Sequence, residues 1–167
     1  MSRLRRWFVR EKVLFITCNL LRTRTRLTDR DFEALASAIA AVRKRREFLF
    51  TAYVFMPDHW HALMIPGAGD TLPRLMDAIK VAATRRINAH RRTQGAVWQF
   101  RYYDHVIRTV REYRDRVQYM HLNPVRKGLV RNPEDWAWSS IHSYGGPGPI
   151  RLPVDLPGLP ADEKAPL

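Results

Sequence analysis

The sequence predicts an α+β domain of the ferredoxin-like kind, with elements in the order β-α-β-β-α-β followed by one further helix. Four short stretches are rich in apolar, β-favouring residues, and three longer ones carry apolar residues at helical spacing. A length of 167 residues, 46% of them hydrophobic, is enough for one domain with a core. We place this domain at residues 1–144. Residues 145–167 are rich in Pro and Gly and are expected to form an extended or disordered tail.

The first half of the chain is expected to hold three strands and one helix. Residues 13–20 form the first strand, and a helix begins at Asp29 with Thr28 as its N-cap. The helix should end in the basic run 43–46, where cations complement the helix dipole. That run is equally typical of a solvated helix end and of a DNA contact. A second strand covers about 48–55, and a third runs from His59 through residue 65 after a turn at 56–58.

The second half is expected to hold two helices and one strand. Thr71 is a suitable N-cap for a helix over residues 72–91, whose apolar stripe is flanked by basic residues. A fourth strand lies within 97–108. The last helix lies within 110–122 and is stopped by Pro124, because proline lacks the backbone N–H that a helix interior needs.

Charge and cysteine content narrow the class of protein. Lys and Arg total 29 against 16 acidic residues, a formal charge of +13, which favours a polyanionic partner over a merely solubilising or ribosomal-type surface. Cys18 is the only cysteine, so a disulfide framework and a thiolate zinc site within the chain are excluded, and a reducing cytoplasm is the expected location. The apolar run 13–21 is too short to span a bilayer, so no membrane association is expected.

A histidine pair follows the second strand. In His59-Trp60-His61 the strand period of two places both imidazoles on one face and the indole on the other. Two neutral imidazoles make half of a divalent-metal site. A lone pair of this kind also occurs for packing reasons. Without other soft ligands, oxygen donors would complete the site, which suits Mg²⁺ or Mn²⁺, although imidazole also accepts Zn²⁺, Co²⁺ or Ni²⁺.

The last helix carries a second polar feature. Arg116, Tyr119 and Asn123 form a stripe at helical spacing, separate from the apolar stripe of the same helix. A tyrosine hydroxyl and an amide would therefore project together, the first as a nucleophile and the second as a metal ligand. Tyr113 is the alternative nucleophile if the helix is rotated. His105 and His121 are candidate general bases, although a structural role is more typical of both.

Four spaced motifs resemble those of one family. They are His59-Trp60-His61 and the runs 98–105, 119–130 and 136–140. In this order they resemble the REP-associated tyrosine transposases, relatives of the IS200/IS605 single-tyrosine HUH transposases. The resemblance runs from about residue 5 to 144 and leaves the tail uncovered.

The resemblance implies an HUH nuclease fold and a set of roles. His59 and His61 would bind the metal, Tyr119 would be the nucleophile, and Asn123 stands where the family places a polar third ligand. The implied substrate is a single-stranded DNA hairpin from a repetitive extragenic palindrome, cut beside a short tetranucleotide. The resemblance also favours a monomer, although some relatives are dimers that share active sites.

Tyr119 is expected to attack the scissile phosphorus with a divalent cation, Mg²⁺ or Mn²⁺, and to form a 5′-phosphotyrosine. Basic and aromatic side chains should grip the hairpin backbone and stack on unpaired bases, although about half of the aromatic ones should be core. The expected DNA-binding residues are Arg3, Arg5, Arg6, Arg85, Arg86, Arg91, Arg92, Trp98, Gln99, Arg101 and Tyr102.

Three other functions compete with this one. A plasmid relaxase or rolling-circle initiator would share the histidine pair, but the chain lacks a helicase segment. A catalytically silent hairpin-binding protein would need neither the histidines nor Tyr119. A metal-dependent hydrolase that uses water would need the metal but not Tyr119.

Overall fold

The computed structural model describes residues 12–156. Its elements are β1 (Val13–Asn19), α2 (Asp29–Arg43), β2 (Phe48–Met56), β3 (His59–Pro66), α3 (Leu72–Arg91), β4 (Tyr103–Ile107), α4 (Val110–Arg126) and two short 3-10 helices, η1 (Pro133–Asp135) and η2 (Ser140–Tyr144). The predicted order β-α-β-β-α-β-α is therefore confirmed. Over the described residues, none of these helices combines the length and the apolar character that crossing a bilayer requires.

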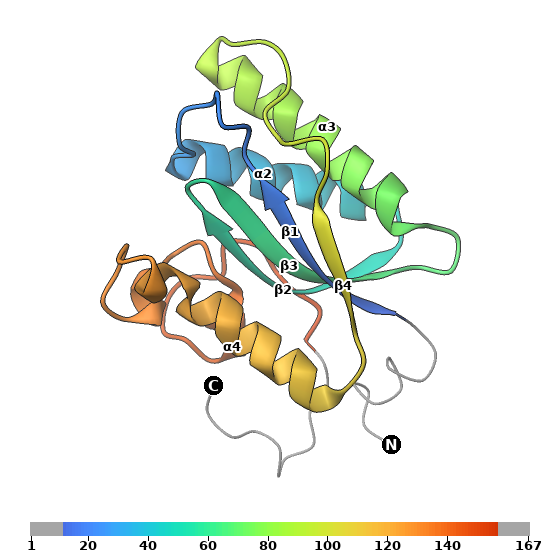
Figure 1. Ribbon diagram of the computed structural model, residues 1–167, viewed down its shortest axis with the longest axis vertical. Helices are drawn as coiled ribbons and strands as arrows, with labels where there is room; N and C mark the ends of the chain where they lie inside the picture. The colour runs from blue at the N-terminus through green and yellow to red at the C-terminus, as the bar shows by residue number, and fades with distance from the viewer. Residues whose placement is uncertain (1–11, 157–167) are drawn as a thin grey trace.

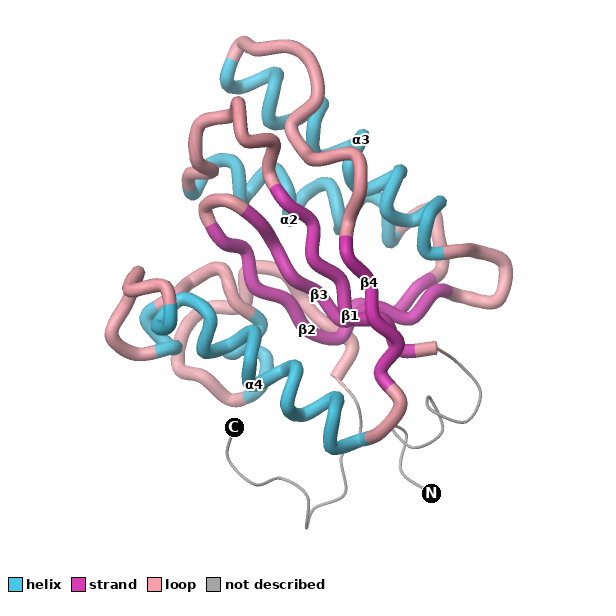
Figure 2. The backbone as a smooth tube through the Cα atoms, in the orientation of Figure 1, coloured by secondary structure: helices cyan, strands magenta, loops and turns pink. Residues whose placement is uncertain are grey.

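The four strands form one antiparallel sheet in the order β2-β3-β1-β4. Because β3 lies between β1 and β2, the β1-α2-β2 unit is split, which is the ferredoxin-like arrangement. Helices α2 and α3 cover one face of the sheet, and α4 covers the other (Figure 1 and Figure 2). The sheet therefore lies between two helical layers and has a core on each face.

The strand period distributes side chains between these two cores. In β1, Leu14 and Ile16 face α2 and α3, whereas Val13 and Phe15 face α4. In β2 a bulge at Thr51 interrupts the alternation, since Phe50 pairs with Met64 and Ala52 with Leu63. The extra residue keeps the aromatic side chains on both sides of the bulge directed at α2 and α3.

The free edge of β2 is covered by the chain that follows α4. The Phe55 N–H donates to the Trp138 carbonyl (2.9 Å), and the Asp155 N–H donates to the Phe50 carbonyl (2.9 Å). The Asp155 carboxylate in turn accepts from the Phe50 N–H (2.8 Å) and from Arg43 (2.7 Å). Residues 145–156, expected to be extended or disordered, contain no helix or strand, yet this part of them is attached to the sheet.

Helix α4 continues past the proline that was predicted to stop it. It ends at Arg126, with Pro124 in its last turn, so the prediction was wrong at this boundary. Near a C-terminus the missing N–H costs one hydrogen bond and interrupts nothing beyond it. The stop comes instead at Gly128, which adopts φ +67° and donates its N–H to the Val125 carbonyl, while the Leu129 N–H donates to the Pro124 carbonyl (both 2.9 Å).

Candidate active site

Strand β3 places the histidine pair on the face of the sheet that α4 covers. Trp60 is fully buried in the opposite core, against α2 and α3. His59 and His61 are 9% and 4% exposed, and their Nε2 atoms lie 3.1 Å apart. The predicted alternation is therefore confirmed, and both imidazoles direct the same ring atom to one point.

Each imidazole is oriented by an oxygen at its other nitrogen. The Nδ1 atom of His59 lies 2.6 Å from the Asp58 carboxylate, and Nδ1 of His61 lies 2.8 Å from the Thr17 hydroxyl. The β1–β3 register brings Thr17 opposite His61. In the tautomer whose Nδ1 donates to these oxygens, the Nε2 lone pair is free, as in histidines that bind metals. Burial and the neighbouring His59 lower the pKa of His61 to about 3, which keeps this imidazole neutral.

The donor set fits a divalent cation. Two ligands at right angles, each about 2.1 Å from an ion, lie about 3.0 Å apart, close to the separation of the two Nε2 atoms. Within residues 12–156 no third His, Cys, Asp or Glu side chain joins them, so further ligands would be amide, water or phosphate oxygens. Asn123, one turn beyond Tyr119 on α4, is buried, and its role as the third ligand stays a prediction.

Helix α4 brings Tyr119 beside the histidine pair. Its ring lies 5.5 Å from the His61 ring in an edge-on arrangement and 6.2 Å from Phe15, which stacks on His61. The side chain is half-buried and packs against the edge of the core beneath α4. Histidines and tyrosine come from segments about sixty residues apart in the sequence and meet on one face of the sheet.

Two arginines of α4 add positive charge that the sequence did not identify as part of the site. The Arg116 guanidinium lies 4.9 Å from the Phe15 ring, and that of Arg126 lies 5.4 Å from the Tyr119 ring. The spacing of Arg116, one turn before Tyr119, was a usable signal for it. Arg126 falls within the motif 119–130, but α4 was predicted to end before it, so it was not placed on the helix with Tyr119. Both guanidinium groups thus add positive charge around the Tyr119 side chain.

The alternative nucleophile, Tyr113, and the two candidate bases, His105 and His121, each have a hydrogen-bond partner outside the histidine pair and Tyr119. Tyr113 is buried against the sheet, its hydroxyl lies 2.9 Å from that of Tyr144, and burial raises its pKa to about 12, so it is not a candidate nucleophile. His121 is buried with Nε2 3.0 Å from the Ser140 hydroxyl, and burial lowers its pKa to about 4. His105 lies 2.6 Å from Glu112 and joins β4 to the start of α4.

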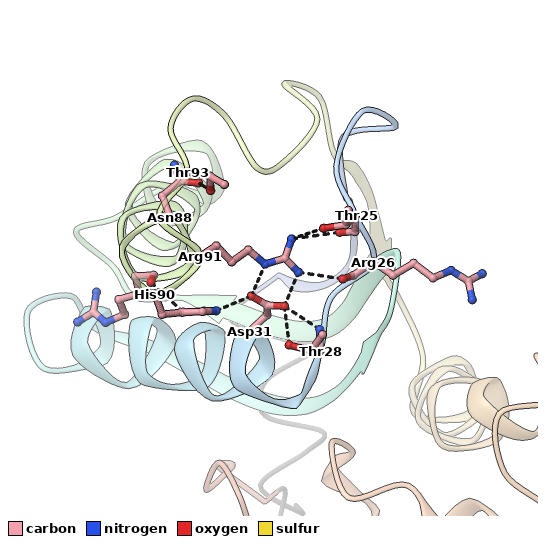
Figure 3. Close-up of polar contacts among 9 residues, drawn as sticks. Thr25, Arg26, Thr28, Asp31, Asn88, His90, Arg91 and Thr93 are labelled. Carbon is pink, nitrogen blue, oxygen red and sulfur yellow. Dashed lines mark hydrogen bonds and ion pairs between the residues drawn. The ribbon is translucent and has the colours of Figure 1, made fainter.

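The expected DNA-binding arginines divide into free and engaged side chains. Arg85, Arg92 and Arg101 are exposed. Arg86 is half-buried and donates to the Ala82 carbonyl of its own helix (3.1 Å). Arg91 is held by the fully buried Asp31, so its expected role in DNA binding is corrected to a structural one (Figure 3). Arg3, Arg5 and Arg6 lie outside the described residues.

The aromatic predictions need a similar correction. Trp98 is 3% exposed and packs edge-on against Trp60, so it belongs to the core and cannot stack on bases. The Gln99 amide donates to the Leu20 carbonyl (3.1 Å), and Tyr102 is half-buried. The exposed aromatic residues of this segment are instead Phe100 (92%) and Tyr103 (54%), which suit stacking better.

Comparisons with known proteins agree with this geometry. The family described as transposase IS200 like matches residues 12–122. The REP-associated tyrosine transposase of Escherichia coli is 31% identical over 99% of this chain and 96% of its own length. A putative REP-associated tyrosine transposase of Haemophilus influenzae is 31% identical over 85% of this chain and 86% of its own length.

Solved structures give the same result. A REP-associated tyrosine transposase bound to a REP hairpin superposes with a TM-score of 0.72 and 30% identity, over 87% of each chain. A putative transposase of Deinococcus radiodurans shares the fold, with a TM-score of 0.51 and 17% identity over 65% of this chain and 88% of its own. The predicted HUH fold is thereby confirmed. The chain belongs to the IS200-like transposase family and, within it, to the REP-associated tyrosine transposases.

Proposed function

We propose that this protein cuts and rejoins single-stranded DNA at hairpins, with Tyr119 as the nucleophile. His59, His61 and Asn123 would hold the divalent cation, Mg²⁺ or Mn²⁺. The observation that carries the proposal is the convergence of the two Nε2 atoms, 3.1 Å apart, beside the Tyr119 ring. The relative solved with a REP hairpin supports the class of substrate.

The chemistry is a transesterification. The Tyr119 oxygen attacks the scissile phosphorus and loses its proton, while the bond from phosphorus to the 3′ oxygen breaks and that oxygen gains a proton. The products are a 5′-phosphotyrosine and a 3′-hydroxyl. Because the number of phosphoester bonds is unchanged, attack by a 3′-hydroxyl reverses the step and joins strands without ATP.

Each residue of the site has a role in this reaction. A tyrosine with its usual pKa near 10 is a weak nucleophile at neutral pH, so the phosphate must be activated. A bound divalent cation supplies Lewis-acid polarisation of that phosphate. Arg116 and Arg126 attract its charge, and Asp58 and Thr17 hold the imidazoles in the orientation that frees Nε2.

A covalent-trapping assay tests the proposal. Hairpin oligonucleotides labelled at either end are incubated with Mg²⁺ or Mn²⁺ and separated on denaturing gels. We expect a metal-dependent adduct that carries the strand 3′ of the cut. It should be lost in Tyr119→Phe and His59→Ala and kept in Glu33→Gln, a change at an exposed acid on α2, which covers the opposite face of the sheet.

Two results would contradict the proposal. Cleavage without an adduct, surviving in Tyr119→Phe, would mean that water is the nucleophile. Hairpin binding without cleavage or adduct, across a panel of hairpin sequences and both metals, would mean that the protein binds DNA without cutting it.

A further inference from the structure

A basic cavity lies at the end of the sheet where β1 ends and β3 begins, on the side that α2 and α3 cover and opposite the face that carries the histidine pair. It has a volume of about 580 Å³ and is formed by the loop after β1, the start of α2 and the end of α3. Its charged lining consists of Arg24, Arg26, Arg30, Arg91 and, when protonated, His90. No carboxylate is among the described residues that line it, and the other lining residues are threonines.

Two of these arginines build the cavity and do not bind a partner outside the protein. Arg24 donates to the carbonyls of Gln94 (2.6 Å), Gly95 (3.0 Å) and Ala96 (2.8 Å). Arg91 binds the Asp31 carboxylate and the carbonyls of the β1–α2 loop (Figure 3). These bonds fix the loop at both ends of the cavity, so the wall is preorganised.

The other two arginines, Arg26 and Arg30, have guanidinium groups that no described residue neutralises. Arg26 and Arg30 are exposed, and within residues 12–156 neither side chain makes a hydrogen bond or an ion pair. In Figure 3 the Arg26 side chain extends away from Asp31, although its carbonyl accepts from Arg91 (2.8 Å). A fixed backbone with a free guanidinium is suited to bind an anion from solution.

The loop that forms the cavity is hydrogen-bonded to the turn that precedes the histidine pair. The Leu20 N–H donates to the Asp58 carbonyl, and the Leu27 N–H donates to the Pro57 carbonyl (both 2.8 Å), so both ends of the loop are bonded to the turn before His59. These two bonds fix the position of the loop that carries Arg26 relative to the turn that precedes His59.

We propose that this cavity binds a backbone phosphate of the unpaired DNA strand that flanks the scissile position, with Arg26 and Arg30 as its charged donors. The inference rests on the proposed function, because the turn at residues 57–58 connects the loop of the cavity to the histidine pair at which the strand would be cut. Binding here would fix the register of the strand relative to the histidine pair. Phosphate contacts position nucleic acid in this way without reading its sequence.

Equilibrium binding of three probes tests the inference in a Tyr119→Phe background, where no cleavage disturbs the measurement. The probes are a blunt DNA hairpin, the same hairpin with an oligo-dT flank, and that flank paired to a complementary strand. We expect Arg26→Gln and Arg30→Gln to weaken binding of the single-stranded flank about 3- to 10-fold each. Each should also reduce the slope of log Kobs against log salt by about 0.7. Affinity for the blunt hairpin should not change.

Arg74→Gln is the matched control, since Arg74 is an exposed arginine near the start of α3, whereas the cavity lies at the end of that helix. A single methylphosphonate moved along the flank adds a second readout, because at one position it should abolish the effect of Arg26→Gln. Equal losses on all three probes, no loss on any, or a loss only with the paired flank would overturn the inference. Failure of the trapping assay alone would overturn the cleavage chemistry and leave these binding results to be judged separately.

Discussion

The two imidazoles of the histidine pair are held differently, although their Nε2 atoms lie 3.1 Å apart. His61 bonds to a neutral hydroxyl on a central strand and is almost fully buried. His59 bonds to a carboxylate whose side chain is 60% exposed, at the end of a turn. The orientation of His59 therefore depends on one charged residue that packing does not fix, which makes Asp58 the more sensitive support.

Replacing Asp58 with asparagine tests this dependence. The amide keeps the size of the side chain but removes the charge that stabilises the Nδ1–H tautomer, and we expect Mn²⁺ affinity to fall about 10- to 100-fold. Isothermal titration with Mn²⁺ measures it, with Glu33→Gln, a change at an exposed acid on α2, as the control. Unchanged affinity would show that the carboxylate does not support the ligand.

For single residues, the sequence predicts well on which face of a strand a side chain lies, but it predicts poorly which distant residue that side chain contacts. His59 and His61 could be placed together because the strand period does not depend on what the strand packs against. Arg91 could not be recognised as structural, because Asp31 lies 60 positions earlier and the helical pattern does not reveal the pairing. Trp98 was misassigned for a related reason, since alternation separates two faces without telling which one is buried.

Among the elements, α2 and α3 are joined by one buried carboxylate. Asp31 accepts from His90 (2.8 Å) and Arg91 of α3, and from the Thr28 N–H (2.7 Å) at the start of its own helix (Figure 3). Burial would raise the pKa of Asp31, but these hydrogen bonds outweigh it and lower the pKa below its ordinary value of 3.8. One residue thus caps α2 and fixes the second helix against it.

Asp31→Asn should lower the free energy of unfolding by about 3–5 kcal/mol, because it leaves the Arg91 charge buried without its counter-ion. Urea denaturation measures the change, and Asp77→Asn, at an exposed acid on α3, is the control. Since the pKa of Asp31 is lowered on folding, its stabilising contribution is complete above about pH 4 and is lost as the pH falls further. A variant as stable as the wild type would refute this role.

The end of α4 gives a second test of an element. Gly128 has φ +67°, a conformation that costs an alanine about 1 kcal/mol, so Gly128→Ala should reduce stability by that amount. Thermal unfolding compares it with Gly69→Ala, where an added Cβ meets nothing within 4 Å. Equal effects of the two substitutions would show that the cap does not depend on glycine.

The elements themselves were largely predictable, and their ends were less so. Apolar spacing places α3 at residues 72–91, as observed, because both its stripe and its N-cap are local. The end of α4 was misjudged because a proline in a last turn costs less than one in a helix interior. The bulge at Thr51 leaves no clear mark in the sequence, since it depends on pairing with β3.

At the scale of the whole molecule, the segment that follows α4 covers the β2 edge of the sheet. Residues 138–140 and 155 bond to β2, and Leu152 is buried in the core beneath α2 and α3. Composition predicted only that residues after 145 lack helices and strands. A high content of Pro and Gly indicates that regular elements are missing, but it does not indicate which long-range contacts the segment makes.

Asp155→Ala should weaken the attachment of this segment to the edge of β2. It removes the acceptor for the Phe50 N–H and the partner of Arg43, and we expect a loss of about 1–3 kcal/mol of stability. Hydrogen exchange at the Phe50 amide should accelerate more than at amides of β1, with Asp115→Ala on the surface of α4 as the control. Unchanged protection of Phe50 would mean that the segment merely lies on the surface.

The covered edge of β2 also bears on how copies of the protein meet. An edge strand with free N–H and carbonyl groups can pair with a strand of another molecule. Proteins commonly prevent this pairing by placing lysine or proline on the edge strand. Here the main chain of residues 138 and 155 already takes up β2 carbonyl and amide groups at both ends of the strand. Continuous sheet formation between two molecules through β2 would first require this segment to peel away.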